Sequence, residues 1–266
     1  MTNRINDLFN LDDKTAVVTG GSRGIGEMIA EGFVDAGASV IMTARKVEAL
    51  EATAARLSEK APEGVSVTAI QGDLSTPEGI TAFADAVKGQ TDSIDILVNN
   101  AGAAWGAPFG EYPVHGWDKV MNLNVRSIYY LTEALAGLLR NAATADAPAR
   151  VINIGSVDGI RTTDMNHYAY STSKAAVHQL TKTLAKTLLG DDVLVNAIAP
   201  GPFESKMMAY ALRDEENRAV VEGMVPQGRI GNPDDMAGMA IFLASKASSH
   251  MTGTIIPVGG GLATIE

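Results

Sequence analysis

Tyr170 and Lys174 are four residues apart, a spacing that places two side chains on one face of a helix. The pKa of a free tyrosine is about 10, which is too high for efficient proton exchange at neutral pH. An ammonium group about 4 Å away, at an effective dielectric constant near 20, would favour the phenolate by roughly 4 kcal/mol and lower that pKa by about three. The pair is therefore a candidate for acid–base chemistry, although the same spacing occurs in ordinary surface helices.

Two more polar residues lie where they could complete a catalytic site. Ser156 directly follows the apolar run 151–154, where a hydroxyl could hold a carbonyl oxygen or merely cap a turn. Asn124 lies inside an expected helix over about 117–139, and asparagine disfavours a helix interior. A contact with a water molecule or a backbone group would explain it there. With these two residues, the tyrosine–lysine pair becomes a candidate catalytic set.

A glycine-rich turn, TGGSRGIG at 19–26, joins an expected strand to an expected helix. Its glycines follow the spacing Gly-x-x-x-Gly-x-Gly, which lets the backbone approach a pyrophosphate while the helix amides face the anion. Glycines also mark simple turns, but the strand–turn–helix context favours a phosphate site. The expected contact residues are Gly20, Ser22, Arg23, Gly24, Ile25 and Gly26.

The end of the second expected strand bears on the choice of cofactor. An enzyme that uses NAD offers an acid to the ribose 2′-hydroxyl there, but the first acid here is Glu48. Arg45 and Arg23 could instead pair with a 2′-phosphate, because a guanidinium matches a phosphate in bidentate geometry. We therefore expect NADP(H) and not NAD(H). The alternative is that both arginines are solvated surface residues.

Two short segments after later strands could also contact the cofactor. Asp73, followed by Leu74, would suit the adenine amino group, but aspartate equally begins turns and caps helices. Asn100, Ala101 and Gly102 follow the fourth expected strand, where an amide can brace loops and line the cofactor. They could also form a simple turn, although their place at the end of a strand favours the binding site.

The elements that must position these residues alternate along the chain. Apolar segments at about 15–19, 38–43, 65–70, 94–98, 151–154, 193–198 and 254–258 predict seven strands separated by helices. This pattern predicts a doubly wound, parallel, Rossmann-type sheet with helices on both faces. Residues 1–266 show no internal linker, so we expect one domain. The segment at about 202–231 has no strand pattern and is expected to form one or two helices over the substrate.

Composition limits the classes of function. The 266-residue chain has no cysteine, which excludes disulfides, thiolate metal sites and a cysteine nucleophile. Its net charge is −10 and it has no basic run, so we expect no nucleic-acid partner. No apolar stretch reaches the roughly 20 residues of a membrane helix, and the first residues lack a signal core. The four histidines show no ligand spacing. We expect a cytoplasmic protein without a metal.

Taken together, these pieces resemble the short-chain dehydrogenase/reductase family over about 14–262. The resemblance is carried by TGGSRGIG, Asp73, NNAG, Asn124, Ser156, YSTSK and the run NAIAPG at 196–201. It implies that Tyr170 donates a proton during carbonyl reduction and that Lys174 lowers the tyrosine pKa and binds the nicotinamide ribose. It also implies that Ser156 orients the substrate carbonyl and that Asn124 holds a water in a proton relay.

The resemblance adds four cofactor contacts in and after the sixth expected strand: Ile198, Pro200, Gly201 and Ser205. It places Ile198 and Ser205 at the nicotinamide carboxamide. Two departures stand out. Ser156 precedes Tyr170 by 14 positions, one more than is usual in the family, and Gly259 stands where the family often has an aspartate.

Within the family, the chain is most similar to β-ketoacyl (3-oxoacyl) reductases of the rhamnolipid-pathway type. This similarity implies reduction of a 3-oxoacyl thioester to a 3-hydroxyacyl product in fatty-acid metabolism. An apolar pocket would hold the acyl chain, unless its members simply pack the core: Trp105, Phe109, Phe203, Met207, Met208 and Met224. The alternatives are a reductase of a sugar, polyol, steroid or other small ketone, a non-catalytic NADP-binding protein, or a carrier-protein or structural partner without a ligand. The family also implies a homodimer or homotetramer formed through the helices at 117–139 and 168–189.

Overall fold

The computed structural model describes residues 4–163, 165–205 and 208–265. These residues form a single Rossmann-type domain built around a seven-stranded, all-parallel sheet in the order β3-β2-β1-β4-β5-β6-β7. The strands are β1 Thr15–Thr19, β2 Ser39–Ala44, β3 Val67–Gln71, β4 Ile96–Asn99, β5 Ala149–Ile154, β6 Val193–Pro200 and β7 Ile255–Val258. The doubly wound sheet expected from the alternating pattern is confirmed.

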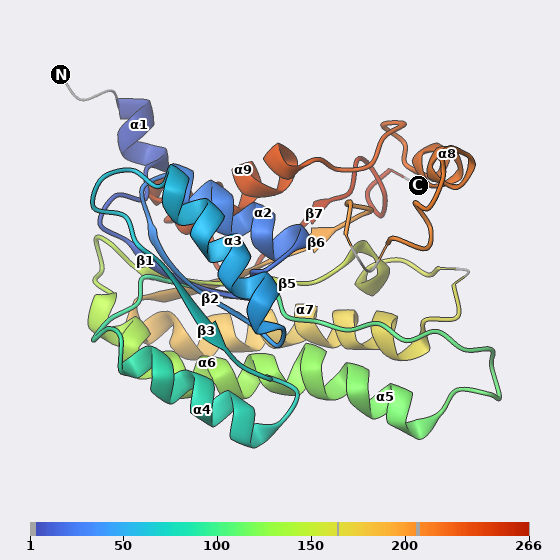
Figure 1. The fold of residues 1–266 in the computed structure, drawn as a ribbon, viewed down its shortest axis with the longest axis horizontal. Coiled ribbons are helices and arrows are strands. Elements are labelled where there is room, and N and C mark those ends of the chain that lie inside the picture. The colour runs from blue at the N-terminus through green and yellow to red at the C-terminus, as the bar shows by residue number, and fades with distance from the viewer. Residues whose placement is uncertain (1–3, 164, 206–207, 266) are drawn as a thin grey trace.

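Helices cover both faces of the sheet (Figure 1). On one face lie α2 Gly24–Asp35, α3 Val47–Lys60 and α9 Pro233–Ala244. On the other lie α4 Pro77–Lys88, α5 Val114–Met121, α6 Ser127–Ala142 and α7 Tyr168–Leu188. Short α1 Arg4–Phe9 precedes the sheet, and α8 Glu215–Met224 lies outside both layers. Single 3₁₀ turns at Val157–Gly159, Leu189–Asp191 and Lys246–Ser248 complete the list.

Alternation along the central strands explains the two-layer core. Val18 and Met42 pack into the cluster under α2 and α9, whereas Val17 and Ile41 pack into the cluster under α4 and α6. Successive side chains of a strand point to opposite faces, so a strand covered on both sides must be apolar throughout. This is why TAVVT and SVIMTA read as nearly continuous apolar runs.

One local feature differs from the expectations, and two others complete the description. Before β1 lies the helix α1, none of whose residues is buried. The helix expected over 117–139 begins at Val114 and is interrupted by a π-helical segment, Asn122–Arg126. Between Pro202 and Gly231, the described residues form one α-helix, α8, and one isolated bridge that joins Phe203 to Gly231. In the described ranges, no helix is both long and apolar enough to cross a membrane.

Candidate active site

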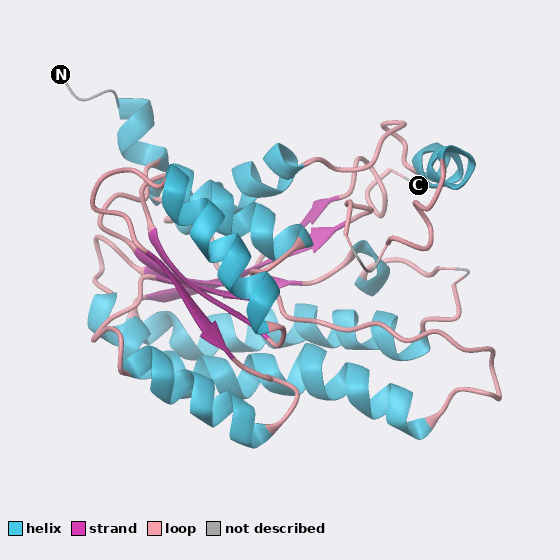
Figure 2. Cartoon of the chain, in the orientation of Figure 1, coloured by secondary structure: helices cyan, strands magenta, loops and turns pink. Residues whose placement is uncertain are grey.

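The parallel strands carry their carboxyl ends to one edge of the sheet, and the long loops extend from that edge (Figure 2). Loops after β1, β4, β5 and β6 therefore bring distant parts of the sequence together there, as is usual for ligand sites in open α/β sheets. The glycine turn follows β1, Asn100 follows β4, and Ser156 follows β5. The first two turns of α7 carry Tyr170 and Lys174.

Lys174 is buried, and its ammonium donates a hydrogen bond to the backbone carbonyl of Ile154, the last residue of β5, over 2.7 Å. Its Nζ lies 5.6 Å from the centroid of the Tyr170 ring. The helical spacing thus places both groups beside the end of β5, as expected. Because an ammonium has three donors, two remain free for other acceptors after the bond to Ile154.

The expectation that Lys174 lowers the pKa of Tyr170 is not met in this structure, where burial is the largest influence on that pKa. Burial raises the pKa of Tyr170 to about 12, although a hydrogen bond with the Ser156 side chain acts in the opposite direction. Burial also lowers the pKa of Lys174 to about 8. The ammonium is held against a carbonyl and not against the phenol oxygen, so removal of water from the phenol is the larger effect. At neutral pH, Tyr170 therefore carries its proton and can donate it.

Ser156 is 6% exposed and caps the 3₁₀ turn that follows β5. Its Oγ accepts a hydrogen bond from the Asp158 backbone N–H over 3.1 Å. Its side chain is also close enough to Tyr170 to lower the pKa of the phenol, against the larger effect of burial. The extra residue between Ser156 and Tyr170 is accommodated in the loop 157–167, so the two hydroxyl groups still meet. Two hydroxyls side by side can hold one carbonyl oxygen.

Asn124 lies in the π-helical segment and is 1% exposed. Its Oδ1 accepts from the backbone N–H of Ala103 over 2.8 Å, and its Nδ2 donates to the Ala103 carbonyl over 2.9 Å. The same Nδ2 donates to Ser173 Oγ over 2.9 Å, and Ser173 Oγ donates to the Tyr170 carbonyl. Of the two explanations expected for a mid-helix asparagine, the backbone contact is present. π-Helical segments are frequent at functional sites.

A buried chain of amide and hydroxyl groups braces α7 under the site, and no sequence motif pointed to it. Asn99 Nδ2 donates to Asn153 Oδ1 over 2.9 Å, and Asn153 Nδ2 donates to Thr181 Oγ1 over 3.0 Å. Asn99 Nδ2 also donates to Thr132 Oγ1 on α6. The chain ties β4 and β5 to the helix that carries Tyr170. Because buried polar groups are costly unless they are paired, these bonds also fix the relative positions of the three elements.

The turn after β1 has the backbone geometry of a phosphate cradle. Gly20 and Gly24 have φ angles of +68° and +56°, a region that favours glycine. A Cβ on Gly26 would lie 2.3 Å from the Gly20 carbonyl oxygen and 2.4 Å from Asn100 Nδ2. Asn100 Nδ2 itself donates to the Thr19 carbonyl over 2.8 Å. Only glycine fits this close approach of turn and helix, and the amides of the first turn of α2 face the space beyond it.

The two arginines proposed for a 2′-phosphate lie free at the surface. Arg23 and Arg45 are exposed, and among the described residues neither guanidinium forms a hydrogen bond or an ion pair. Arg45 lies close enough to Asp73 for its charge to lower that carboxyl's pKa, while Asp73 Oδ1 accepts from the Ser75 backbone N–H over 3.0 Å. A turn contact for Asp73 is therefore present. The residues present fit a dinucleotide with a 2′-phosphate: the glycine turn offers a backbone cradle, and the guanidinium groups of Arg23 in that turn and of Arg45 after β2 are free to pair with a phosphate.

The remaining predicted cofactor residues lie along the same edge. Ser22 and Ile25 belong to the glycine turn; the Ser22 carbonyl accepts from Thr53, and Ile25 packs against the core. Ala101 donates its backbone N–H to Thr19 Oγ1, and Gly102 lies against Asn124 Oδ1. Leu74 is buried.

The predicted nicotinamide contacts lie in and after β6. Ile198 and Pro200 belong to the C-terminal end of that strand, and Gly201 packs on Gly259. A Cβ on Gly24 would lie 3.1 Å from Ser205 Cβ, so Ser205 lies beside the glycine turn. A Cβ on Gly259 would lie 2.9 Å from Val157 Cγ1, so a larger residue at 259 would crowd the Val157 side chain.

The expected apolar pocket does not form as one cluster. Phe203 is 2% exposed and belongs to the main core, whereas Phe109 is 88% exposed and Met224 is 62% exposed. Trp105 packs edge-on against His115, with ring centroids 5.1 Å apart. Met208 is half-buried, and Met207 lies outside the described residues. The alternative, that these residues serve packing, holds for Phe203, which lies in the core and whose backbone forms a bridge with Gly231.

Three polar residues near Tyr170 were missed by the sequence analysis. Asp158 Oδ1 lies 4.0 Å from Arg161 Nε, and its charge acts on both His167 and Tyr170. The His167 ring packs edge-on against the Tyr170 ring, with centroids 6.0 Å apart. The only signal in the sequence was the presence of ionisable residues in the loop between Ser156 and Tyr170. Nothing in their spacing distinguishes them from residues of a solvated loop.

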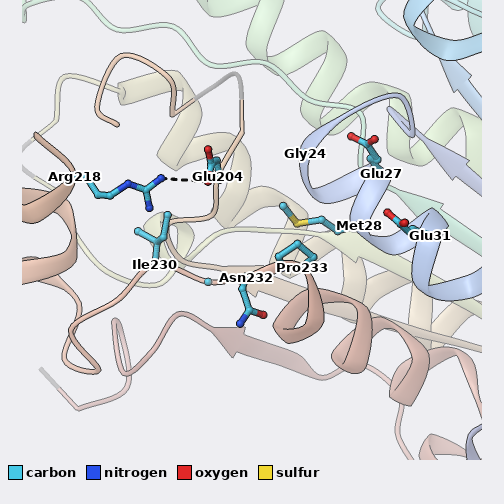
Figure 3. A pocket seen from close by; sticks show the side chains of 10 residues that line it. Gly24, Glu27, Met28, Glu31, Glu204, Arg218, Ile230, Asn232 and Pro233 are labelled. Atoms are coloured by element: carbon cyan, nitrogen blue, oxygen red, sulfur yellow. Dashed lines mark hydrogen bonds and ion pairs between the residues drawn. The ribbon is translucent and has the colours of Figure 1, made fainter. Parts of the chain in front are cut away.

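A cavity of about 420 Å³ lies beside the glycine turn and not beside Tyr170 (Figure 3). Gly24 and Met28 of α2 form one wall, and Ile230 and Pro233 form another. Arg218 of α8 bridges to Glu204 over 3.2 Å across its far side. The segment after β6 therefore lies near the glycine turn, and the cavity separates the two.

Comparisons with known proteins agree with this geometry. The family model described as "Enoyl-(Acyl carrier protein) reductase" matches residues 20–263. The chain is 48% identical over 253 residues to the rhamnolipids biosynthesis 3-oxoacyl-[acyl-carrier-protein] reductase of Pseudomonas aeruginosa, covering 95% of this chain and 97% of that protein. It is 38% identical over 257 residues to a 2-dehydro-3-deoxy-D-gluconate 5-dehydrogenase of Pseudoalteromonas atlantica, covering 95% and 97%.

The fold agrees equally well with a solved structure. The chain superposes on the Pseudomonas aeruginosa RhlG/NADP active-site complex with a TM-score of 0.93 and 48% identity, covering 97% of this chain and 99% of that one. The resemblance carried by the sequence motifs is confirmed: the chain belongs to the short-chain dehydrogenase/reductase family.

Proposed function

We propose that this protein reduces the ketone of a 3-oxoacyl thioester with NADPH, yielding a 3-hydroxyacyl thioester. The observation that carries the proposal is the meeting of Ser156, Tyr170 and Lys174 at the end of β5. These groups come from two elements and share one edge of the sheet with the glycine turn. A structural role alone would not require a half-buried phenol, a buried ammonium and a buried hydroxyl in one place, because burying ionisable groups is costly.

In this proposal, each residue has a separate task. The Ser156 hydroxyl orients the substrate carbonyl, and the protonated phenol of Tyr170 gives its proton to the carbonyl oxygen. Lys174 keeps one donor on the Ile154 carbonyl and offers the others to the nicotinamide ribose. Asn124 stiffens the loop at Ala103 and links it to α7, and the family resemblance adds a water in a proton relay. When bound, NADPH supplies the hydride.

The cofactor contacts are proposed for the same edge. The backbone around Gly20, Gly24 and Gly26 would hold the pyrophosphate, and Arg23 and Arg45 would pair with the 2′-phosphate. Asp73 and Leu74 would contact the adenine. Three residues after β4 would line the ribose: Asn100, Ala101 and Gly102. Four residues in and after β6 would contact the nicotinamide: Ile198, Pro200, Gly201 and Ser205. The unpaired state of the two guanidinium groups and the NADP in the RhlG complex support NADPH over NADH.

The substrate class is supported by the relative that reduces a 3-oxoacyl chain on acyl carrier protein, at 48% identity. A second candidate is a sugar-acid ketone, supported by the relative acting on 2-dehydro-3-deoxy-D-gluconate and by the polar residues Asp158, Arg161 and His167 near Tyr170. A panel of acetoacetyl-coenzyme A, a keto-sugar acid and a simple ketone, each assayed by NADPH oxidation, separates the two. Turnover of the sugar acid without turnover of the thioester would reject the first candidate.

Tyr170→Phe tests whether the site is catalytic at all. The variant removes one hydroxyl, so we expect at least a 100-fold loss of kcat with little change in the Kd for NADPH, in keeping with the contribution of general acid–base catalysis, roughly 10²–10⁴-fold. Tyr130→Phe, at an exposed tyrosine of α6, is the matched control and should retain activity. Full turnover in Tyr170→Phe would refute the assignment and favour a non-catalytic NADP-binding protein.

The domain organisation, cellular location and oligomeric state of the protein are further parts of the proposal. We infer that residues 1–266 act as one domain whose segment 202–231 covers the substrate, and that the protein works in the cytoplasm as a homodimer or homotetramer. The exposed side chains of Trp117 on α5 and Tyr129 on α6 support an interface along the α5–α6 and α7 helices. Light scattering gives the molar mass directly, and a monomer at micromolar concentration would contradict this part of the proposal.

A further inference from the structure

The imidazole of His167 has no assigned role, yet it lies beside the reactive phenol. His167 is the N-cap residue of α7, three positions before Tyr170, so both side chains lie on the same face of the helix. The two rings meet edge-on, with centroids 6.0 Å apart and an interplanar angle of 75°. A group that binds the phenol's hydroxyl would therefore extend past the imidazole if it continued along this face.

The loop after β4 holds the imidazole from its other side. Ala107 donates its backbone N–H to the Asn166 carbonyl over 3.2 Å, which joins this loop to the residue before His167. Gly106 packs directly on the ring: a Cβ there would lie 3.1 Å from His167 Cδ2 and 3.5 Å from its Nε2. A larger residue at 106 would press on the imidazole. The ring is therefore held between Gly106 and Tyr170, half-buried, and is not free to turn away into solvent.

The ring nitrogens remain available for a ligand. Among the residues that the structure describes, the His167 side chain makes no hydrogen bond. Asp158 lies close enough to act on it electrostatically, and Asp158 is in turn 4.0 Å from Arg161. Burial lowers the pKa of His167, and the Asp158 charge opposes that change. At neutral pH the ring is therefore a neutral imidazole, which keeps one N–H donor.

We propose that His167 is a specificity-determining residue, whose ring N–H donates a hydrogen bond to a second carbonyl oxygen of the substrate, separated by one methylene carbon from the ketone held by Tyr170 and Ser156. In a 3-oxoacyl thioester this is the thioester carbonyl, so the inference rests on the proposed function. The ketone oxygen would lie at the two hydroxyls and the thioester oxygen at the imidazole. A simple ketone has no group for this second position.

The role of Asp158 follows from its place. It lies in the 3₁₀ turn capped by Ser156, and its backbone N–H donates to Ser156 Oγ, so its backbone is fixed relative to the hydroxyl proposed to hold the ketone. Its negative charge raises the pKa of His167 against the larger effect of burial. Tyr210, from the segment after β6, lies near the same carboxyl and donates to Met165 Sδ over 3.9 Å.

The test compares His167→Leu with His167→Gln on two substrates, acetoacetyl-coenzyme A and cyclohexanone, with NADPH as reductant. Leucine keeps much of the volume but removes the donor, whereas glutamine restores a donor. We expect His167→Leu to lower kcat/KM for the thioester by roughly 10- to 100-fold, as for a lost hydrogen bond, with less than a threefold change for the monoketone. His167→Gln should recover at least part of the loss. The exposed His250→Leu is the matched control.

Other results have distinct meanings. A loss of less than twofold for the thioester in His167→Leu overturns the inference, as does an equal loss on both substrates, which would indicate a structural role. Thermal unfolding and the Kd for NADPH of each variant show whether the fold and the cofactor site survive. If the wild-type protein reduces cyclohexanone but not the thioester, the proposed function fails first, and the inference fails with it. If it reduces only the thioester, a loss in His167→Leu that glutamine does not restore counts against the hydrogen bond.

Discussion

Lys174→Met should change how the stability of the protein depends on pH. Burial lowers the pKa of Lys174 from 10.5 to about 8 in the folded protein. Below pH 8 the amine is charged in both the folded and the unfolded chain, so folding carries the full cost of burying the charge. Between pH 8 and 10.5 the unfolded chain binds more protons than the folded one, so stability rises with pH. Methionine at this position has no proton to lose and no such dependence.

The size of the effect follows from the two pKa values. The difference of about 2.5 corresponds to about 3.4 kcal/mol over the whole window, at 1.36 kcal/mol for each unit of pKa. Of this total, about 2 kcal/mol is gained in the free energy of unfolding between pH 7 and pH 9.5. The free energy of unfolding of the wild-type protein minus that of Lys174→Met should therefore increase by about 2 kcal/mol over this interval. The subtraction removes the titration of all groups common to both proteins.

Urea unfolding at fixed protein concentration, followed by circular dichroism at several pH values without cofactor, measures the difference. Lys182→Met, at an exposed position of the same helix, controls for the removal of a lysine charge from α7. A difference between wild type and Lys174→Met that stays constant from pH 7 to 9.5 would refute the reasoning. It would mean that the ammonium is hydrated in the folded state, in spite of its burial against the Ile154 carbonyl.

Two further substitutions test the nucleotide site. Arg45→Asp should raise the KM for NADPH by roughly 10- to 100-fold, the equivalent of a lost hydrogen bond to a charged group, and should change the KM for NADH less. If steady-state assays show that both KM values rise equally, Arg45 does not bind a 2′-phosphate. Gly26→Ala should lower stability by roughly 1–3 kcal/mol, because its Cβ would lie 2.3 Å from the Gly20 carbonyl oxygen. Gly137→Ala on α6, with open space around it, should be neutral or stabilising, and equal melting temperatures of the two variants would contradict the crowding argument.

The positions of the strands were predictable from the sequence because they depend on local pattern. β1 has the predicted bounds, Thr15–Thr19. A strand buried on both faces must be apolar along its whole length, and a helix that begins with proline after Thr76 has a clear N-terminus. The interruption of the long helix at Asn122–Arg126 was not predictable. It arises where Asn124 bonds to Ala103, a residue from another loop.

What the sequence determined by itself was the order of strands and helices, the glycine turn and the types of the catalytic candidates, since all of these depend on residues close together in the chain. Tertiary structure alone decided the electrostatics. Whether Lys174 lowers the pKa of Tyr170 depends on where its ammonium points and how much water remains, and it points to the Ile154 carbonyl. Tertiary structure also brought the charge of Asp158 near the phenol and placed Phe203 in the core. Burial and the direction of a side chain are set by contacts between distant segments, which no local spacing encodes.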